Sequence, residues 1–169
     1  MGEIEVTTMR KKIKFFVCYA HNNHLIVDDF LNRLEDVLGP SKAHEYVLWR
    51  DLNIAVGEDW DKEIKKSMNA CDLGLLLLSW SFLKSNYISE VELPMFVNEK
   101  SKPCVPVVIQ ELDFELHDLK GLEKKQLFML KGKRFTEPRS YGKCRGRRRD
   151  EFVLELFRAI EHKLRSMDI

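Results

Sequence analysis

Apolar and polar positions alternate along this chain in blocks that predict strands and helices in turn. Four short runs rich in apolar residues predict buried strands, and the first of them is also rich in β-branched and aromatic residues. They span residues 13–19, 45–51, 73–79 and 103–110. The third run, LGLLLLS, is apolar on both faces, which is typical of a central parallel strand covered by helices on either side.

Between and after these runs, apolar residues recur at helical spacing. Helices are predicted over residues 24–39, 59–71, 87–100 and 149–167. The helix at 87–100 contains Pro94, so we expect it to be interrupted or kinked there. Residues 53–60 and 79–87 are predicted as loops. The stretch 112–135 is ambiguous, with QLFML or KRF as candidates for a short edge strand.

This strand–helix alternation predicts an α/β protein with a flavodoxin-like three-layer fold. We expect a five-stranded parallel sheet of order 2-1-3-4-5 with helices on both faces. In that order the chain changes direction across the sheet between strands 1 and 3, so a ligand cleft is expected at their carboxyl ends. The predicted organisation is a flexible N-terminal segment over 1–11 and a single domain over 12–169.

Composition narrows the function classes only slightly. The chain has 28 Lys and Arg against 27 Asp and Glu, so nothing global predicts a nucleic-acid or membrane partner. The N-terminus lacks an apolar signal region, and the longest apolar run is too short to span a bilayer. Four cysteines without a CxxC pair are interpreted as reduced, buried thiols of a cytoplasmic protein.

One dense cationic run stands out, KCRGRRR at 143–149. It has no interleaved aromatic residues beyond Tyr141 for stacking on bases. A solvated loop is therefore favoured over a docking segment for nucleic acid or an acidic partner.

Several common chemistries find no support in the sequence. There is no GxGxxG and no GxxxxGK[ST], which argues against a dinucleotide fold of the Rossmann type and against a P-loop. The acidic residues of a response-regulator receiver are missing, because their places hold YAHNN and SWS. His21 and His24 are interpreted as a polar surface pair, since no cysteine or carboxylate cluster accompanies them. No metal and no cofactor are expected.

Two glutamates lie near the start of the apolar helix that follows the third strand. Glu90 and Glu92 are two residues apart, so they lie on different faces of that helix. The helix grows out of the loop at the expected cleft, which is where topology would place a carboxylate with a functional role.

Four segments together resemble a bacterial-type Toll/interleukin-1 receptor (TIR) domain of the NAD-cleaving subgroup. They are KIKFFVCYAHNN, VLWRDLNIAVGEDWDKEI, LGLLLLSWSFLKSNYISEVEL and CVPVVI, in this order and spacing. The resemblance covers about residues 12–166. One departure is Cys18, where the family often has serine, and we expect this change to be tolerated because the side chain stays small.

The resemblance implies an NAD+ glycohydrolase or cyclase, a hydrolase of the NAD+ nucleosidase class. Such enzymes release nicotinamide and give ADP-ribose or a cyclic isomer, and they serve in anti-phage defence. The catalytic group is a glutamate, often preceded four residues earlier by an aromatic side chain. Here Val91 lies four residues after Tyr87, whereas the subgroup form YISEVEL selects Glu92. Glu90 remains the alternative, as does the possibility that both glutamates are merely solvated.

By position, the resemblance also implies residues that border bound NAD+: Tyr19, Ala20, His21, Asp51, Ser79 and Tyr87. Tyr87 would stack on nicotinamide or, alternatively, pack into the core. Asp51 is expected to hold the loop 51–60, in which Gly57 provides backbone freedom and Trp60 packs.

In the family this loop covers the nucleotide and contacts a neighbouring domain, so self-association through TIR–TIR contacts is expected. A separate sensor or effector protein is a further possible partner, whereas a membrane and nucleic acid are not expected. The rival interpretation is a TIR interaction module or adapter without enzymatic activity. A small-ligand-binding protein of flavodoxin-like fold is a weaker third interpretation.

Overall fold

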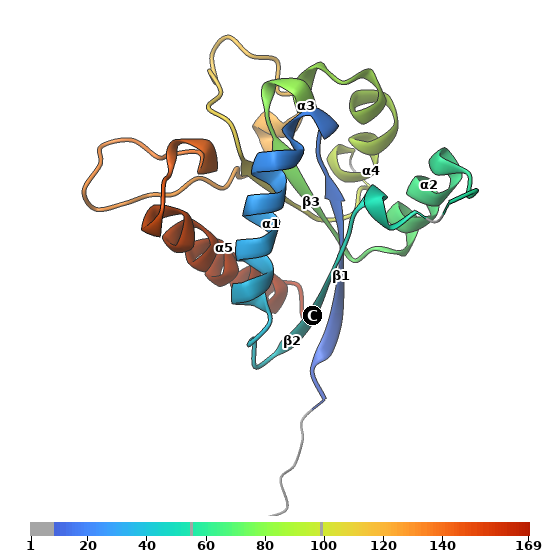
Figure 1. Cartoon of the computed structure of the whole chain (residues 1–169), viewed down its shortest axis with the longest axis horizontal. Helices are drawn as coiled ribbons and strands as arrows, with labels where there is room; N and C mark the ends of the chain where they lie inside the picture. The colour runs from blue at the N-terminus through green and yellow to red at the C-terminus, as the bar shows by residue number, and fades with distance from the viewer. Residues whose placement is uncertain (1–8, 55, 99) are drawn as a thin grey trace, which may run out of the picture.

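A parallel sheet of four strands forms the centre of this protein in a computed structural model, which describes residues 9–54, 56–98 and 100–169. The strands are β1 (Lys11–Cys18), β2 (His44–Trp49), β3 (Leu73–Leu78) and β4 (Cys104–Val108). Their order is β2-β1-β3-β4, all parallel (Figure 1). Most of the N-terminal segment predicted over 1–11 lies outside the described residues.

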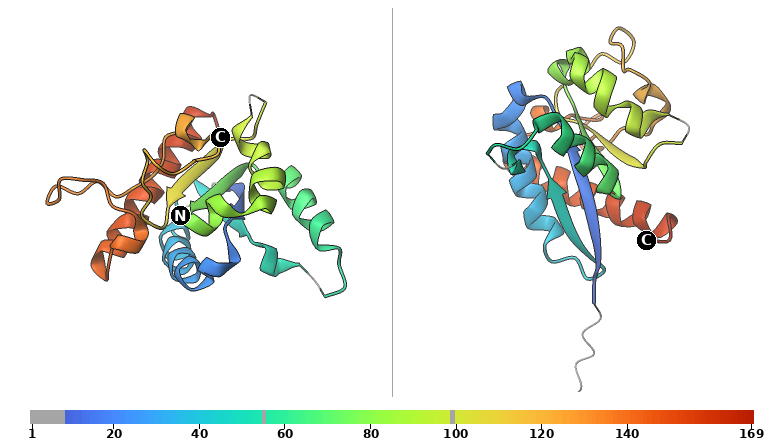
Figure 2. Two further views of the ribbon diagram at one scale, coloured as in Figure 1. Left: turned by 90° about the horizontal axis from the view of Figure 1, so that it is seen from above. Right: turned by 90° about the vertical axis from the view of Figure 1, so that its right-hand side faces the viewer.

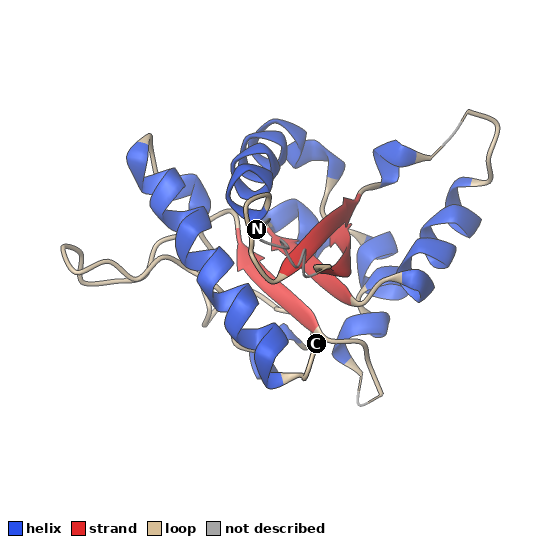
Figure 3. Ribbon diagram, turned by 90° about the horizontal axis from the view of Figure 1, so that it is seen from below, coloured by secondary structure: helices blue, strands red, loops and turns tan. Residues whose placement is uncertain are grey.

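Helices cover both faces of the sheet and give the predicted three layers. α1 (His24–Leu38) and α5 (Arg147–Ser166) lie together on one face, as the views in Figures 2 and 3 show. The other face carries α2 (Trp60–Ala70), α3 (Trp80–Lys84) and α4 (Pro94–Val97). The α/β class and the parallel sheet with helices are therefore confirmed.

Strand alternation divides the apolar side chains into two cores. In β1, Phe15 points toward α1 and α5, whereas Phe16 and Cys18 point toward α2, α3 and α4. Trp49, predicted to lie in the core, is partly buried and stacks on Phe16 with ring centroids 5.3 Å apart. Cys18, the last residue of β1, therefore faces the layer of helices that carries Glu90 and Glu92.

Gly74 of β3 lets that layer approach the sheet closely. A Cβ atom placed on Gly74 would lie 2.6 Å from the Phe96 ring of α4, which is closer than real side chains allow. A glycine in the middle of a buried strand is thus explained by close packing of the helix that follows the glutamates.

The fifth strand of the prediction is wrong for the described residues. The candidate segment QLFML does lie beside β4, but it makes only one parallel bridge, between Phe128 and Val107. Extending that ladder toward the start of β4 would require an N–H from Pro106, and proline has none. In the other direction the Leu130 N–H donates to Arg139 O instead. The predicted edge strand is reduced to isolated bridges.

The break expected near Pro94 is confirmed, but the helix predicted over 87–100 is shorter than expected and the loop predicted over 79–87 is partly helical. A short helix, α3, occupies part of the predicted loop 79–87, because the Ser79 hydroxyl accepts a hydrogen bond from Phe82 N–H and caps it. A π-helical turn spans Ile88–Glu92, and α4 begins afresh with Pro94 as its first residue. Proline is favoured at that position and breaks a helix further in.

Short 3-10 helices complete the described elements at His21–Asn23, Asp51–Asn53, Leu122–Lys124 and Tyr141–Lys143. All four cysteines are buried free thiols. No helix among the described residues is long and apolar enough to cross a membrane.

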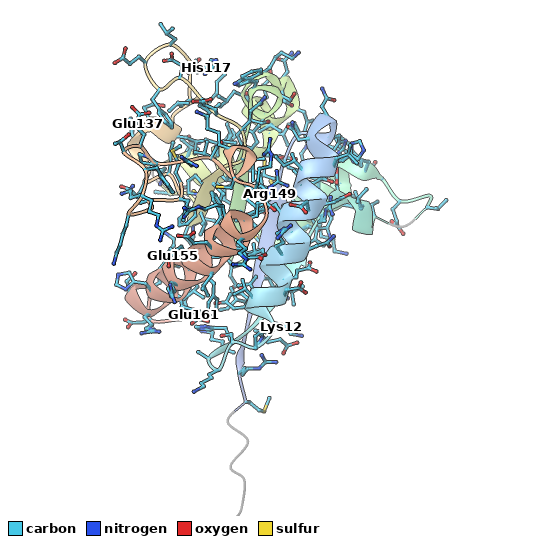
Figure 4. The ribbon with its side chains drawn as sticks, turned by 60° about the vertical axis from the view of Figure 1, so that its left-hand side comes forward. Lys12, His117, Glu137, Arg149, Glu155 and Glu161 are labelled. Carbon is cyan, nitrogen blue, oxygen red and sulfur yellow. The ribbon has the colours of Figure 1, made fainter. Side chains whose placement is uncertain are left out.

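The cationic run 143–149 makes contacts within the chain itself. Arg149 donates to Cys144 O and pairs with Asp29 of α1 at 2.8 Å, while Arg148 pairs with Glu151. Figure 4 shows Arg149 at the start of α5, beside α1. The Arg149–Asp29 pair therefore fastens the start of α5 to α1.

Candidate active site

A cavity of about 310 Å³ opens at the carboxyl ends of β1 and β2, on the face that carries α2 and α3. Four segments build it: the loop after β1, the loop after β2, the start of α2 and the stretch from α3 to the π-helical turn. Its walls are formed by Tyr19, Ala20, His21, Asn22, Asp51, Trp60, Ser81, Lys84, Ser85, Tyr87, Ile88 and Glu92. The cavity therefore lies at the edge of the sheet where topology predicted a cleft.

The π-helical turn places Glu92 in this cavity. Leu93 N–H donates to Ile88 O at 2.8 Å, a hydrogen bond that spans five residues instead of four. Residues five apart therefore stack along this turn, and both Tyr87 and Glu92 line the cavity. The extra residue in the turn accounts for the five-residue spacing of the aromatic residue and the carboxylate. Glu90, by contrast, is exposed and does not line the cavity.

Glu92 is a buried carboxylate with a single hydrogen-bond donor. Only 7% of the residue is exposed, and the Cys18 thiol donates to Oε2 at 2.5 Å. The second oxygen, Oε1, has no hydrogen-bond partner among the residues that the structure describes. Burial raises the pKa of Glu92 to about 7, the Cys18 hydrogen bond opposes that rise, and Asp51 adds a smaller repulsion. The side chain can therefore change charge near neutral pH.

A second polar cluster lies across the cavity and joins two loops. The Tyr19 hydroxyl donates to Asp51 Oδ1 at 3.1 Å, and His21 Nε2 contacts Asp51 Oδ2. Arg50 donates to the Tyr19 hydroxyl at 3.3 Å and lies over the Tyr19 ring. Asp51 thus ties the start of the loop 51–60 to the loop after β1.

Two aromatic rings form a wall of the cavity. Trp60 and Tyr87 have ring centroids 4.7 Å apart, and the Tyr87 hydroxyl donates to Asp61 at 2.9 Å. This hydrogen bond and burial raise the pKa of Tyr87, burial contributing most. Trp60, predicted only to pack, is instead a half-exposed partner of Tyr87 at the site.

Ser79 is the one predicted site residue that does not line the cavity. Its hydroxyl donates to Asn23 Oδ1 at 2.6 Å and caps α3. It joins the loop after β1 to the loop after β3 at the same edge of the sheet. The other six predicted residues, namely Tyr19, Ala20, His21, Asp51, Tyr87 and Glu92, all border one space.

Sequence reasoning missed the contact between Cys18 and Glu92. The signal was present in the departure from serine at the end of the first strand, but its partner lies 74 residues further along the chain. Lys84 and Ser85 also line the cavity and carried no signal, because the region was interpreted as a plain loop.

A larger cavity of about 650 Å³ lies elsewhere, between the edge of β4 and α5. Its lining includes Phe128 and Met129, with Lys131 and Lys163 at the rim. No buried carboxylate faces it, so the smaller cavity is the stronger candidate for catalysis. Among the described residues, no cluster of three or more His, Cys, Asp or Glu side chains could hold a metal ion.

The arrangement around Glu92 suits the stabilisation of positive charge on a ligand. A carboxylate with one oxygen that has no hydrogen-bond partner among the described residues faces a space walled in part by aromatic rings, and a charge fixed in this way can stabilise an opposite charge on a ligand. Nearby hydroxyl and imidazole groups from Tyr19 and His21 can orient a polar ligand through hydrogen bonds.

The family model described as TIR domain matches residues 15–140 of this chain, which is well over half of its length. The match runs from the middle of β1 to the residue next to the 3-10 helix Tyr141–Lys143, and it includes every residue that lines the cavity. Among curated proteins, none matches the chain.

Proposed function

This chain belongs to the TIR domain family, and from that premise we propose that it cleaves NAD+ between nicotinamide and ribose, with Glu92 as the catalytic carboxylate. The observation that carries the proposal is the buried Glu92 side chain, which faces a cavity and has one oxygen without a hydrogen-bond partner among the described residues. The products are nicotinamide and either ADP-ribose or a cyclic isomer. A role in anti-phage defence extends the proposal on resemblance alone.

One carboxylate suffices for this reaction because of the leaving group. Most glycosidases need an acid to protonate the departing oxygen and a second carboxylate behind the sugar. The nicotinamide of NAD+ leaves as a neutral molecule from a cationic ring, so no proton donor is required. The remaining task is to stabilise the positive ribosyl centre, and the ionised Glu92 carboxylate performs it electrostatically.

The other side chains of the cavity bind and orient the substrate. The Trp60 and Tyr87 rings offer an apolar wall for nicotinamide. Tyr19 and His21 lie where the ribose and phosphates would pass, held in place by Asp51. A volume of about 310 Å³ is at the lower end of the range for ligand sites. It fits the nicotinamide–ribose half, and the remainder of the dinucleotide would lie outside it.

The loop 51–60 supports self-association as part of the proposal. Leu52 and Val56 are exposed apolar side chains beside the cavity, and such residues gather at contact surfaces. The same observation favours the second candidate function, a TIR interaction module without catalysis. The two candidates differ in one measurable respect, which is whether nicotinamide is released.

The decisive experiment compares Glu92→Gln with Glu90→Gln. Concentrated protein is incubated with NAD+, and products are identified by chromatography and mass spectrometry. Glu92→Gln keeps the size of the side chain and removes its charge, so turnover should fall about a hundredfold or more. Glu90→Gln makes the same chemical change at an exposed position and should keep turnover.

Three outcomes would contradict this proposal in different ways. If Glu90→Gln loses activity and Glu92→Gln keeps it, the catalyst is Glu90. If both variants keep full turnover, no carboxylate of this helix is catalytic. If the unmutated protein releases no nicotinamide at any concentration, the interaction module is the better description.

Self-association has its own test at Gly57. This residue has a φ of +90°, which proline cannot adopt. Gly57→Pro should therefore disturb the exposed loop, and specific activity should rise less steeply with protein concentration than in the unmutated protein. Specific activity that is independent of concentration in the unmutated protein would remove self-association from the proposal.

A further inference from the structure

The thiol of Cys18, at the end of β1, donates a hydrogen bond to the candidate catalytic carboxylate, Glu92. Cys18 is the last residue of β1, and its side chain points into the layer of α2, α3 and α4. Cys18 is 1% exposed and Glu92 is 7% exposed, and Cys18 Sγ lies 2.5 Å from Glu92 Oε2. It is the only hydrogen bond that the Glu92 side chain makes within the described part of the chain.

We propose that Cys18 is a positioning residue for Glu92. Its thiol holds Oε2 against the end of the central strand, so that Oε1 stays directed to the substrate in the cavity. This inference rests on the proposed NAD+ cleavage for its catalytic meaning. The contact itself exists whether or not the chain is an enzyme.

Three observations make the thiol suited to this task. A buried thiol has no competing water, and Cys18 is almost fully enclosed. Burial, followed by the nearby Glu92 carboxylate, raises the pKa of Cys18 well above its ordinary value, so the sulfur keeps its proton and remains a donor. A rigid strand is also a better support than a loop, because its backbone is fixed by pairing on both sides.

A thiol is a weak donor, and this weakness has a consequence for Glu92. A hydroxyl would stabilise the ionised carboxylate more strongly. The thiol therefore fixes the position of Glu92 Oε2 but stabilises the negative charge of the carboxylate only weakly. The charged or titratable groups around Glu92 are Cys18 from β1, His21 from the next loop, Asp51 after β2, Lys84 at the end of α3 and Tyr87 before the π-helical turn. Of these, Cys18 alone hydrogen-bonds to Glu92.

The test uses two substitutions at Cys18 and one matched control. Cys18→Ala removes the donor without adding bulk, and Cys18→Ser replaces it with a stronger donor of similar shape. Cys71→Ala makes the same change at a buried cysteine of the same core, whose thiol donates to Met68 O instead. For each protein, kcat/KM for nicotinamide release is measured from pH 5.5 to 9.

We expect the acid limb of the pH profile, which reports the ionisation of Glu92, to move in opposite directions in the two Cys18 variants. Cys18→Ala should shift it up by about one pH unit, because loss of a hydrogen bond to a charged group makes ionisation harder. Cys18→Ser should shift it down, and Cys71→Ala should leave it in place. An unmoved limb in both Cys18 variants would overturn the inference, as would an equal shift in Cys71→Ala.

A second measurement does not depend on enzymatic activity. The melting temperature of the protein minus that of Glu92→Gln is followed against pH. The midpoint of this difference lies between the pKa values of Glu92 in the unfolded and folded states, so it moves when the folded-state pKa moves. The same pair is then compared in the Cys18→Ala background, where the midpoint should lie at higher pH. If the protein releases no nicotinamide but the midpoint moves, the proposed function fails and the Cys18 contact stands. If the midpoint does not move, the contact fails whatever the activity.

Discussion

Two glutamates of this protein are equally buried and yet differ in nearly every other respect. Glu92 and Glu161 are each 7% exposed. Glu161 lies on α5 (Figure 4) and receives three hydrogen bonds, from Ser41 at 2.5 Å, His44 at 2.9 Å and Tyr46 at 2.9 Å. Glu92 receives one, from a thiol. Within the described residues, both oxygens of the Glu161 carboxylate accept hydrogen bonds, whereas only one oxygen of Glu92 does.

This difference in donors, together with the deeper position of Glu92 in the protein, gives the two carboxyl groups opposite pKa shifts. Burial raises the pKa of Glu161, but hydrogen bonds from Ser41, Tyr46 and His44 outweigh it, and the pKa is lowered overall. For Glu92, burial prevails and the pKa rises to about 7. Glu161 is thus held as a carboxylate, whereas Glu92 is poised between its two forms at neutral pH.

The comparison shows what distinguishes a structural from a functional buried charge here. Glu161 links α5 to β2 and to the turn before it, so its hydrogen bonds serve the fold. Within the part of the chain that the structure describes, one Glu92 oxygen has no hydrogen-bond partner and lies beside a cavity, an arrangement that a protein optimised only for stability would not keep. Solvent exposure alone does not separate the two glutamates, but the number of hydrogen-bond donors does.

The largest effect on stability is expected at Glu161. Glu161→Ala leaves two buried donors, Ser41 and His44, and the half-buried Tyr46 hydroxyl without this acceptor, so the free energy of unfolding should fall by about 4 kcal/mol. Turnover per folded molecule should be unchanged, because Glu161 is remote from the cavity that Glu92 lines. Thermal and denaturant unfolding measure the first quantity, and nicotinamide release measures the second.

Glu155→Ala on the same helix is the matched control. Glu155 pairs with Arg158 at the surface, and such exposed pairs contribute little to stability. If Glu161→Ala lost turnover as strongly as Glu92→Gln, the division between a structural and a functional glutamate would be broken.

Much of the fold was accessible from the sequence because it depends on local patterns. The four apolar runs became β1 to β4, and the alternation of strands and helices gave the parallel three-layer arrangement. The failures arose where a single backbone group decided the outcome. The missing N–H of Pro106 stopped the edge ladder, and the Ser79 hydroxyl capped a short helix, α3, inside the loop predicted over 79–87.

The candidate site was accessible only in part, for a related reason. Resemblance and topology brought Glu92, Tyr19, His21, Asp51 and Tyr87 to one region, and the structure places them around one cavity. The partners that set their properties come from distant parts of the chain. No periodicity links Cys18 to position 92, and no pattern foretells a π-helical turn.

A pH series of stability sharpens the contrast between the two glutamates. The pKa of Glu92 is raised from 4.5 to about 7 on folding, so the folded protein binds this proton more tightly than the unfolded chain. The resulting stability is complete below about pH 4.5 and is lost as pH rises through 7. Glu161 has the opposite sign, because its lowered pKa gives stability that is lost as pH falls.

Glu92→Gln should therefore stabilise the protein at pH 8, by roughly 2–3 kcal/mol. At pH 5 the gain should fall to about a quarter of this value, since Glu92 is then protonated in the folded state while the unfolded chain has begun to lose the proton. Melting temperatures of the two proteins across this range provide the measurement, with Glu90→Gln as the control that shows no gain. A stabilisation of equal size at pH 5 and pH 8 would mean that the negative charge on Glu92 does not destabilise the folded protein.

The smallest effect tests whether the donors of Glu161 act individually. Tyr46→Phe removes one hydroxyl and keeps the ring that stacks near Phe15. Because Ser41 and His44 still donate to Glu161, the free energy of unfolding should fall by only about 1 kcal/mol. The same substitution in the Glu161→Ala background should have almost no effect, since the hydroxyl has already lost its acceptor there. This double-mutant cycle isolates the Tyr46–Glu161 hydrogen bond. An equal loss in both backgrounds would show that the tyrosine contributes through packing alone, and that Glu161 is less fully satisfied than its three donors indicate.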